Sequence, residues 1–369
     1  MRGETDQQAL MLTTLTPEDF VRRDHPIRRI KVTVDRVLGE LSPVFEGMYA
    51  KTGRPSVPPE HLLKASLLMA LFSIRSERQF EDRLRCDLMF KWFLDLNIES
   101  AGFDATTFSK NRQRLLEHDV TRQFFGKVTG EARRLGLLSE EHFSVDGTLL
   151  EAWASVKSFR PRDEGDGSDG GRPGPGEGGR DQEVDFHGQK RSNKTHVSTT
   201  DPEARLARKG PGKEAKLSFV GHVLMENRSG IVVDMEVTTA TGTAEVEAAK
   251  RMLLRSADRE DREKKLTVGA DKGYDCWEFR NACLENGIAP HVAVKKTTRA
   301  WMRIIEATGY ETSQKIRKRI EECFGWMKTV GGCRKLRYIG RARNELWMLI
   351  SVSAYNLVRL SKLAPPAAA

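Results

Sequence analysis

The sequence predicts an all-helical N-terminal domain followed by an α/β domain in which a mixed sheet is flanked by helices. Three observations predict this fold class. The first 135 residues carry mostly helical apolar patterns. From residue 142 the apolar residues alternate with polar ones, which indicates strands. Further along the chain, helical patterns alternate with single strands, which is typical of an α/β domain.

Size and composition describe a chain with a substantial core and no membrane segment. Its 369 residues suffice for two or three domains, 38% of them are hydrophobic and 31% charged, and the mean hydropathy is −0.52. The longest apolar runs, 62–74 and 346–360, are too short and too interrupted to span a bilayer, and the N-terminus has no secretory pattern. We therefore expect a cytoplasmic protein that does not bind membranes.

Cysteine usage and charge narrow the function classes. The five cysteines are scattered and form no CxxC pair, so neither a zinc site nor a disulfide framework is indicated. The net charge is +9, and residues 311–343 contain ten Lys or Arg against three Glu. A concentrated basic surface is typical of a polyanion binder, although a solvated helix face can carry the same charges.

Three segments of the N-terminal region read as helices. Residues 58–74 begin with Pro and are dense in apolar residues, as in a buried helix. The next segment, 76–84, has Ser76 and Gln79 spaced as a capping box. Short helices whose last member is basic suit a helix-turn-helix-like DNA reader, and a plain helical bundle with a charged face is the alternative. The solvent face of the third segment, 104–118, is expected to present Ser109, Lys110, Arg112, Gln113 and Arg114, and we predict that Lys110, Arg112 and Arg114 bind DNA.

The pattern changes at residue 142. In EHFSVDGTLLEA the residues Phe143 and Val145 alternate with Ser144 and Asp146, as in a strand with one buried face. Residues 161–180 then contain eight glycines and three prolines, a composition that cannot form a core. We expect residues 161–214 to be an inserted, disordered segment.

The remaining segments complete the order βββαβαβα. Two strand-like runs are joined by ENRSG, a hairpin signal. This order is that of an RNase H-like domain. The predicted domains are a helical DNA-binding domain at 1–135, a catalytic domain at 136–160 and 215–335, the insertion at 161–214, and a C-terminal helix and tail at 336–369. The later elements are predicted as a helix over 243–257, a strand over 266–271, a helix over 275–286, a strand over 288–294 and helices over 311–330 and 344–362.

Two aspartates lie where a sheet can present them to a ligand. Asp146 interrupts an apolar strand, which is unfavourable unless its carboxylate is hydrogen-bonded, exposed or bound to a cation. Asp271 ends the strand LTVGAD, and the carboxyl ends of strands in open α/β sheets are where ligand sites gather. Either residue alone is more typical of a turn or a cap, but two in one sheet favour a site.

The helix RKRIEECFGWMK offers a third carboxylate. At 100° per residue, Glu321 lies with Arg317 and Lys328 on one shoulder of an apolar stripe that packs on the sheet. Glu322 lies nearly opposite the stripe, where an exposed ion pair with Lys318 is expected. The stripe consists of Ile316, Ile320, Cys323, Phe324 and Met327.

Three carboxylates on two strands and a helix suit Mg²⁺ or Mn²⁺, and two such ions can act on a phosphodiester. The flanking cations Arg317 and Lys328 would then neutralise phosphate charge. A structural acid cluster, with the cations as salt-bridge partners, is the alternative.

Several motifs resemble one known family. The run R317-x3-E321-x6-K328 resembles the catalytic-helix signature of insertion-sequence DDE transposases, in particular the insertion-sequence "five" group. FSVDGTLLEA and GADKGYD resemble the blocks around the first and second Asp of that family, and KTGRPSVPPEHLLKASLLMALF resembles its preceding helical domain. The resemblance spans roughly residues 45–360. It implies an RNase H-like core, a divalent metal and cut-and-paste transposition of DNA bounded by terminal inverted repeats.

Carried over residue by residue, the resemblance implies that Asp146, Asp271 and Glu321 are the catalytic and metal-binding triad. Arg317 and Lys328 would be the basic members of the helix signature, and Tyr274 matches the aromatic residue that follows the second Asp. One position departs from the signature. Where the family has Tyr this sequence has Gln314, and Tyr310 lies one helical turn earlier.

The sequence therefore predicts a DNA transposase that cleaves and joins the ends of its element with two Mg²⁺ or Mn²⁺ ions. Its partners would be the terminal inverted repeats and the target DNA, bound by a homodimer in the bacterial nucleoid. Two alternatives stay open: an RNase H-like nuclease without strand transfer, and an inactive DNA-binding repressor derived from a transposase.

Overall fold

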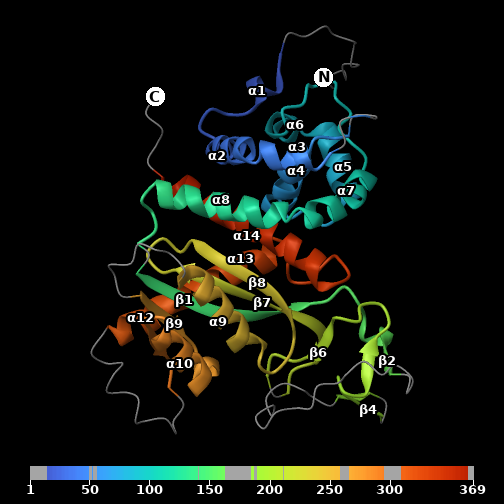
Figure 1. Cartoon of the computed structure of the whole chain (residues 1–369). Helices are drawn as coiled ribbons and strands as arrows, with labels where there is room; N and C mark the ends of the chain where they lie inside the picture. The colour runs from blue at the N-terminus through green and yellow to red at the C-terminus, as the bar shows by residue number, and fades with distance from the viewer. Residues whose placement is uncertain are drawn as a thin grey trace, which may run out of the picture.

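The computed structural model describes residues 15–49, 52, 56–139, 141–162, 184–186, 189–210, 212–257, 266–294 and 309–364. It shows a layer of helices stacked on a sheet that is covered on both faces, with the long helix α14 between the two parts (Figure 1). This confirms the predicted fold class, an α/β domain behind a helical N-terminal region.

The N-terminal part is built from short helices with recognisable start signals. Two prolines stand at the start of α4, and Ser76 caps α5 by accepting a hydrogen bond from the backbone N of Gln79 at 3.1 Å. The Gln79 side chain accepts from Arg75 N at 3.1 Å, so the capping signal predicted there is confirmed with a shifted second partner. The helices are α1 (Pro17–Phe20), α2 (Ile27–Glu40), α3 (Ser42–Gly47), α4 (Pro59–Leu71), α5 (Glu77–Cys86), α6 (Leu88–Phe93), α7 (Thr106–Glu117) and α8 (Val120–Arg134).

The C-terminal helix α14 (Arg341–Leu363) is the centre of the molecule. It packs against α2, α4 and α8 on one side and against the sheet on the other, and its residues from Leu346 to Leu357 are all buried. One continuous apolar core therefore joins the N-terminal helices to the sheet through α14.

Trp347 on α14 illustrates this shared core, and its truncation tests it. Its side chain is 1% exposed, and the Arg337 guanidinium lies 3.7 Å from its ring centroid. We expect Trp347→Ala to lower the free energy of unfolding by about 3–5 kcal/mol, since it leaves a large cavity. Trp153→Ala is the control, because Trp153 is 55% exposed, and it should cost less than about 1 kcal/mol in the same urea titration. Equal losses would contradict a core centred on α14.

The main sheet has the strand order β8–β7–β1–β9–β10. Of these five strands, β1, β7 and β8 form an antiparallel meander, and β9 and β10 run parallel to β1. In chain order this is 3-2-1-4-5, which agrees with the predicted RNase H-like core. The strands are β1 (His142–Glu151), β7 (Lys216–Glu226), β8 (Val232–Thr239), β9 (Leu266–Ala270) and β10 (Ile288–Val292).

Different helices cover the two faces of the sheet. Phe143 and Val145 of β1 join a core cluster with residues of α9 (Ala244–Ala257) and α10 (Trp277–Glu285). The other face is covered by α12 (Tyr310–Ile316), the 3₁₀ turn η5 (Arg317–Arg319) and α13 (Ile320–Thr329), together with α14. The helix predicted over 311–330 is thus interrupted by one 3₁₀ turn, a correction to the prediction of an unbroken helix.

The predicted insertion is only partly described. Residues 163–183 lie outside the described residues, but 189–210 contain strands, so the prediction of a disordered segment is wrong for that part. Polar side chains bond the loop backbone there: Asn193, 8% exposed, accepts from Leu206 N at 2.8 Å and donates to Leu206 O at 2.9 Å. The short strands are β2 (Phe159–Pro161), β3 (Val184–Phe186), β4 (Gln189–Arg191), β5 (His196–Ser198) and β6 (Arg205–Ala207), of which β6 joins the main sheet beside β7.

Candidate active site

Strand register brings the two predicted aspartates together. The parallel pairing of β1 with β9 ends at Ser144 opposite Gly269. Two residues further along each segment stand Asp146, within β1, and Asp271, immediately after the last residue of β9, so the two lie level with each other. This is also the place where β1 has its antiparallel partner on one side and its parallel partner on the other, a typical position for a ligand site.

Asp146 is partly buried, and its acidity reflects this. Burial, reinforced by the negative charges of Asp271 and Glu245, raises the pKa of the Asp146 carboxyl to about 7. A hydrogen bond from Gly147 N to Asp146 Oδ1 at 2.8 Å and the charge of Arg317 act in the opposite direction without cancelling the effect. A cation that takes the place of the proton would therefore stabilise the ionised form of this carboxyl.

Asp271 combines a structural role with its position beside Asp146. Its Oδ1 accepts a hydrogen bond from Gly273 N at 2.7 Å and so caps the 3₁₀ turn η2 (Lys272–Tyr274). Tyr274, the aromatic residue singled out in the sequence, is fully buried and packs against Phe279. The capping bond uses one carboxylate oxygen of Asp271.

The helix segment α12–η5 lies directly on β9. A Cβ at Gly269 would be 3.0 Å from Ser313 Oγ and 3.6 Å from Arg317 Cβ, so this glycine permits the close approach. Gln314, at the position where the signature has Tyr, donates from Nε2 to Ala270 O at 3.2 Å and to the carbonyl oxygen of His291. Its Oε1 accepts from Arg317 Nε at 3.4 Å. Gln314 therefore ties the helix to two strands and orients Arg317.

Lys328 contacts the face of β1 that carries Asp146, at a position two residues further along the strand. Its Nζ donates to Thr148 Oγ1 at 2.6 Å. Burial, reinforced by the charges of Lys209 and Arg334, lowers the pKa of the Lys328 ammonium. Arg317 beside Gly269 and Lys328 beside Thr148 therefore stand on either side of Asp146.

The neighbouring glutamates differ in direction rather than in burial. Glu321 and Glu322 are both exposed. Glu321 lies one helical turn after Arg317, on the helix shoulder that also carries Lys328, and these two cations contact β9 and β1. The charge of Glu322, in contrast, acts on Tyr355 of α14. The ion pair predicted between Glu322 and Lys318 is absent, although both residues are described, because exposed side chains gain little from such a pair.

The apolar stripe from Ile316 to Met327 is buried with one exception. Ile320, Cys323 and Met327 are fully buried and Phe324 is 8% exposed, as predicted. Ile316 is 38% exposed, so its place in the buried stripe is a wrong prediction. It precedes the 3₁₀ turn, which changes the direction of side chains before it relative to those after it.

A fourth carboxylate was missed by the sequence. Glu245, in the first turn of α9, has its Oε1 only 3.0 Å from where a Cβ at Gly147 would lie, and His222 Nδ1 is 3.2 Å from the same point. Gly147 thus leaves room for these side chains on the α9 face of β1, opposite the face that carries Asp146, and the charge of Glu245 still acts on the Asp146 carboxyl. The one sequence signal was the glycine inside the strand pattern, which often marks a close approach.

The carboxylates are of the type that binds a divalent cation, but they do not form a complete coordination site. Carboxylate oxygens are the ligands that Mg²⁺ and Mn²⁺ prefer, and Asp146 and Asp271 provide two neighbouring ones. Among the described residues, however, no three His, Cys, Asp or Glu side chains are close enough together to hold an ion as they stand. The third ligand would have to come from an exposed side chain that turns inward, as Glu321 can.

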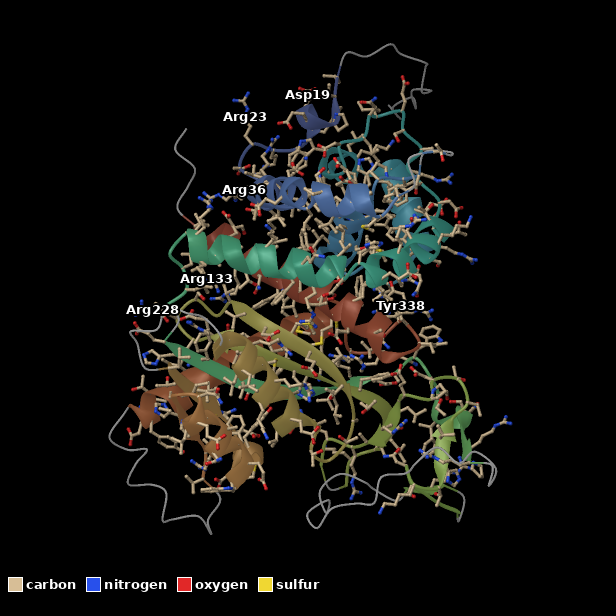
Figure 2. The ribbon with its side chains drawn as sticks, viewed as in Figure 1. Asp19, Arg23, Arg36, Arg133, Arg228 and Tyr338 are labelled. Carbon is tan, nitrogen blue, oxygen red and sulfur yellow. The ribbon has the colours of Figure 1, made fainter. Side chains whose placement is uncertain are left out.

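The basic residues predicted on α7 are placed differently from one another. Arg112 forms an ion pair with Glu77 at 2.7 Å and lies 4.0 Å over the ring of Tyr338, which is labelled near α7 in Figure 2. Arg114 lies 4.6 Å over the Tyr49 ring and is also partly buried. The expectation that Arg112 and Arg114 lie on the solvent face is wrong, because both pack against aromatic rings. Lys110 is exposed, as predicted.

The raised pKa of Asp146 predicts a pH dependence of stability. In the unfolded chain this carboxyl loses its proton near pH 3.8, whereas in the folded, metal-free protein it keeps it up to about pH 7. Over that interval the folded state binds the extra proton, so through this group the free energy of unfolding falls as pH rises.

The measurement is urea unfolding with EDTA at several pH values between about 5 and 8, for wild type and Asp146→Asn. The variant has no carboxyl to titrate, so its advantage over wild type should grow up to about pH 7 and then stay constant. A difference that does not change with pH would show that Asp146 ionises normally.

Two family models match this chain. A family described as "Transposase domain (DUF772)" matches residues 15–114, and one described as "Transposase DDE domain" matches residues 193–357, which include Asp271 and Glu321. Within the described residues, the helices are all too short or too polar to cross a membrane.

Three solved structures resemble this chain weakly, in both sequence identity and TM-score. A piggyBac transposase synaptic complex with hairpin DNA is 9% identical, with 93% of this chain and 77% of that chain covered and a TM-score of 0.44. A Mos1 strand transfer complex is 10% identical, covering 79% and 82%, with a TM-score of 0.20. A Mos1 mariner paired end complex with Mn is 13% identical, covering 83% and 88%, with a TM-score of 0.21. Residues cannot be matched one by one at these values.

Proposed function

We propose that this chain, which belongs to the insertion-sequence DDE transposases, cuts DNA at the ends of its element and joins them to target DNA with Asp146, Asp271 and Glu321 as its catalytic carboxylates. One observation carries the proposal. The parallel register of β1 and β9 sets Asp146 level with Asp271, under the helix that bears Arg317, Glu321 and Lys328.

These three carboxylates would hold Mg²⁺ or Mn²⁺. When bound, a pair of such ions activates the attacking oxygen and stabilises the leaving oxygen at a phosphodiester. Asp146 and Asp271 supply oxygens from neighbouring strands, and Glu321 supplies the third from the helix. Asp146 must release the proton that burial favours before it can serve as a ligand, so metal binding should release protons below about pH 7.

The two cations on the helix would orient the DNA. Arg317 is held by Gln314 and Lys328 by Thr148, so each presents its charge at a defined place beside the carboxylates. Such fixed charges can bind phosphate oxygens on either side of the scissile bond without reorganising during the reaction. The protein thus acts mainly by positioning and electrostatics.

The partner is double-stranded DNA, namely the terminal inverted repeats and the target, in the bacterial nucleoid. Two ends must be brought together, so a homodimer on DNA is part of the proposal. We assign the helical region at 1–135 to binding the ends, with exposed Lys110 as its best-placed basic residue on α7.

The test is an assay with labelled duplexes that carry the DNA flanking the coding region, in the presence of Mg²⁺ and a target plasmid. Cleaved ends and joined products are expected, and both should disappear with EDTA. Hydrolysis without joining would indicate a nuclease, and binding without cleavage would indicate a repressor. The family matches favour neither alternative.

A further inference from the structure

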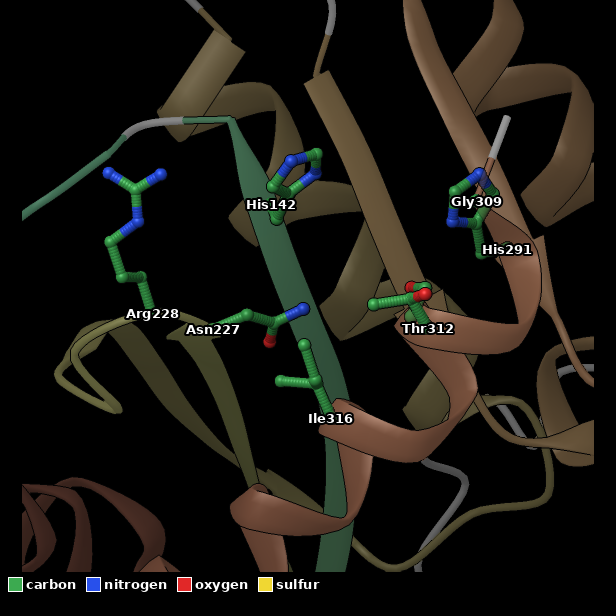
Figure 3. A pocket seen from close by; sticks show the side chains of 8 residues that line it. His142, Asn227, Arg228, His291, Gly309, Thr312 and Ile316 are labelled. Carbon is green, nitrogen blue, oxygen red and sulfur yellow. The ribbon is translucent and has the colours of Figure 1, made fainter.

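The edge of β1 that pairs with β9 has a second partner at its far end. At the start of β1, where His142 stands in Figure 3, this edge pairs with β9 as far as Ser144. At Glu151 it pairs again, in parallel, with Lys335, because β7 occupies the opposite edge over this whole stretch. Asp146 therefore lies on the part of the edge between β9 and the segment that contains Lys335.

This second segment is strongly basic. The basic segment, residues 334–343, reads RKLRYIGRAR and contains five Lys or Arg and no acid. Two of the cations, Arg337 and Arg341, bind groups of the protein itself. Of the other three, only Lys335 has a described carboxylate within ion-pair distance, that of Glu151 at 3.9 Å. These three exposed side chains are Arg334, Lys335 and Arg343. Their uncompensated charge favours a polyanion as partner.

Hydrogen bonds hold the basic segment in one shape before any partner binds. At its start, Leu336 N donates to Glu151 O at 2.7 Å. Further along, the fully buried Asn344 donates from Nδ2 to Tyr338 O at 2.8 Å and to Gly340 O at 2.9 Å. A surface that is already ordered loses little conformational freedom on binding, which favours affinity.

The described part of the insertion holds the same segment from the other side. Asp201 is fully buried, and its Oδ2 accepts a hydrogen bond from Gly340 N at 3.2 Å. Glu203 Oε2 accepts from Arg341 N at 2.8 Å. Both bonds lie at the start of α14, so the insertion fixes the place where the basic segment enters the central helix.

Two large apolar side chains stand exposed among these cations. Ile339 is 41% exposed and belongs to the basic segment. Trp153, just beyond β1, is 55% exposed, and Lys335 Nζ lies 5.9 Å from its ring centroid. Cations beside exposed apolar groups suit a nucleic-acid backbone, in which phosphates alternate with sugars.

The basic segment joins the carboxylate site to the N-terminal helices. Tyr338, labelled in Figure 2, donates from its hydroxyl to Glu77 Oε1 of α5 at 3.0 Å, and Arg112 of α7 lies 4.0 Å over its ring. At the other end, Glu151 stands five residues after Asp146 on β1, a distance of about 17 Å at about 3.3 Å per strand residue. With a rise of about 3.4 Å per base, this corresponds to about five base pairs.

We propose that the basic segment binds the backbone of the element-end duplex about four to six base pairs from the cut, between the cleavage site and the part bound by α7. Arg334, Lys335 and Arg343 contact phosphates, and Trp153 packs against the sugars. The inference rests on the proposed function, because it takes the end DNA at the carboxylate site as given. It also assigns a role to the described part of the insertion, which positions the basic segment for the duplex.

The first test is the salt dependence of binding to end duplexes, measured by fluorescence anisotropy without metal. Arg334→Ala and Arg343→Ala should each lower the slope of log K against log salt by about 0.9, and should weaken binding about fivefold or more at about 0.1 M salt. Lys362→Ala is the matched control, because Lys362 is an exposed cation at the other end of α14, and it should change neither quantity.

Ethylation interference locates the contact on the DNA. With wild type, ethylated phosphates about four to six base pairs from the cut should hinder binding. With Arg334→Ala the interference should be lost there and persist at the phosphates bound by the N-terminal helices. Unchanged slopes for both Arg variants, or effects of these variants on target DNA instead of end DNA, would overturn the assignment.

Cleavage of the ends in Mg²⁺ is followed in parallel. A wild type that cuts the ends, with Arg variants that bind them as wild type does, rejects the role of the basic segment alone. A wild type that neither binds nor cuts the ends rejects the proposed function and this inference together.

Discussion

Asp146→Asn should slow cleavage of the DNA ends by about 10³-fold or more at saturating Mg²⁺. The substitution removes a charged oxygen ligand, and metal-based stabilisation of a phosphodiester transition state is worth several kcal/mol. The rate is measured under single-turnover conditions, so that product release does not mask the effect. Joining to target DNA should fall with cleavage, because we propose that the same carboxylates serve both steps.

The fold should survive this substitution. Because burial disfavours the charged form of Asp146, the metal-free variant should be at least as stable as wild type near pH 8. Binding to uncut ends in EDTA should also be retained. A variant that still cuts within about tenfold of the wild-type rate would remove Asp146 from the site.

Glu321→Gln and Glu322→Gln should behave very differently despite their adjacency. Both side chains are exposed on the same turn of α13, so their effects on stability should be equally small. Glu321→Gln is expected to slow cleavage by about 10²- to 10³-fold, because it removes the helix ligand. Glu322→Gln should stay within about twofold of wild type.

Calorimetric titration with Mn²⁺ gives a readout that does not depend on turnover. In the presence of end DNA, Glu321→Gln should weaken metal binding and Glu322→Gln should leave it unchanged. Equal effects of the two variants, in either assay, would mean that the shoulder shared with Arg317 and Lys328 does not face the metal site.

Much of the fold follows from local pattern. The alternation in β1, the hairpin signal at ENRSG and the helical stripe through Ile320 and Met327 were visible in the sequence, because backbone period decides which residues share a face. The order of these elements then led to the RNase H-like sheet. The predicted disorder at 189–210 was wrong because polar composition alone does not reveal bonds such as those of Asn193 to Leu206.

The candidate site was predicted in part for the same reason. The helix signature and the two Asp-containing strand segments are local motifs, so their residues could be named. The place of Glu245 beside Gly147 and the hydrogen bonds of Gln314 to two strands could not be predicted, since their partners lie tens of residues or more away in sequence. Arg112 and Arg114 were misplaced because their aromatic partners, Tyr338 and Tyr49, also come from distant segments.

The sequence by itself determined the type of most elements of the core, the apolar faces of β1 and of the helix through Ile320 and Met327, and the chemical nature of the candidate ligands. Only the tertiary structure decided which side chains share space. The parallel register set Asp146 beside Asp271. The approach of α12 to Gly269 placed Arg317, and the 3₁₀ turn left Ile316 outside the core. The physical reason is that secondary structure follows backbone periodicity over a few residues, whereas register and packing depend on contacts between segments far apart in the chain.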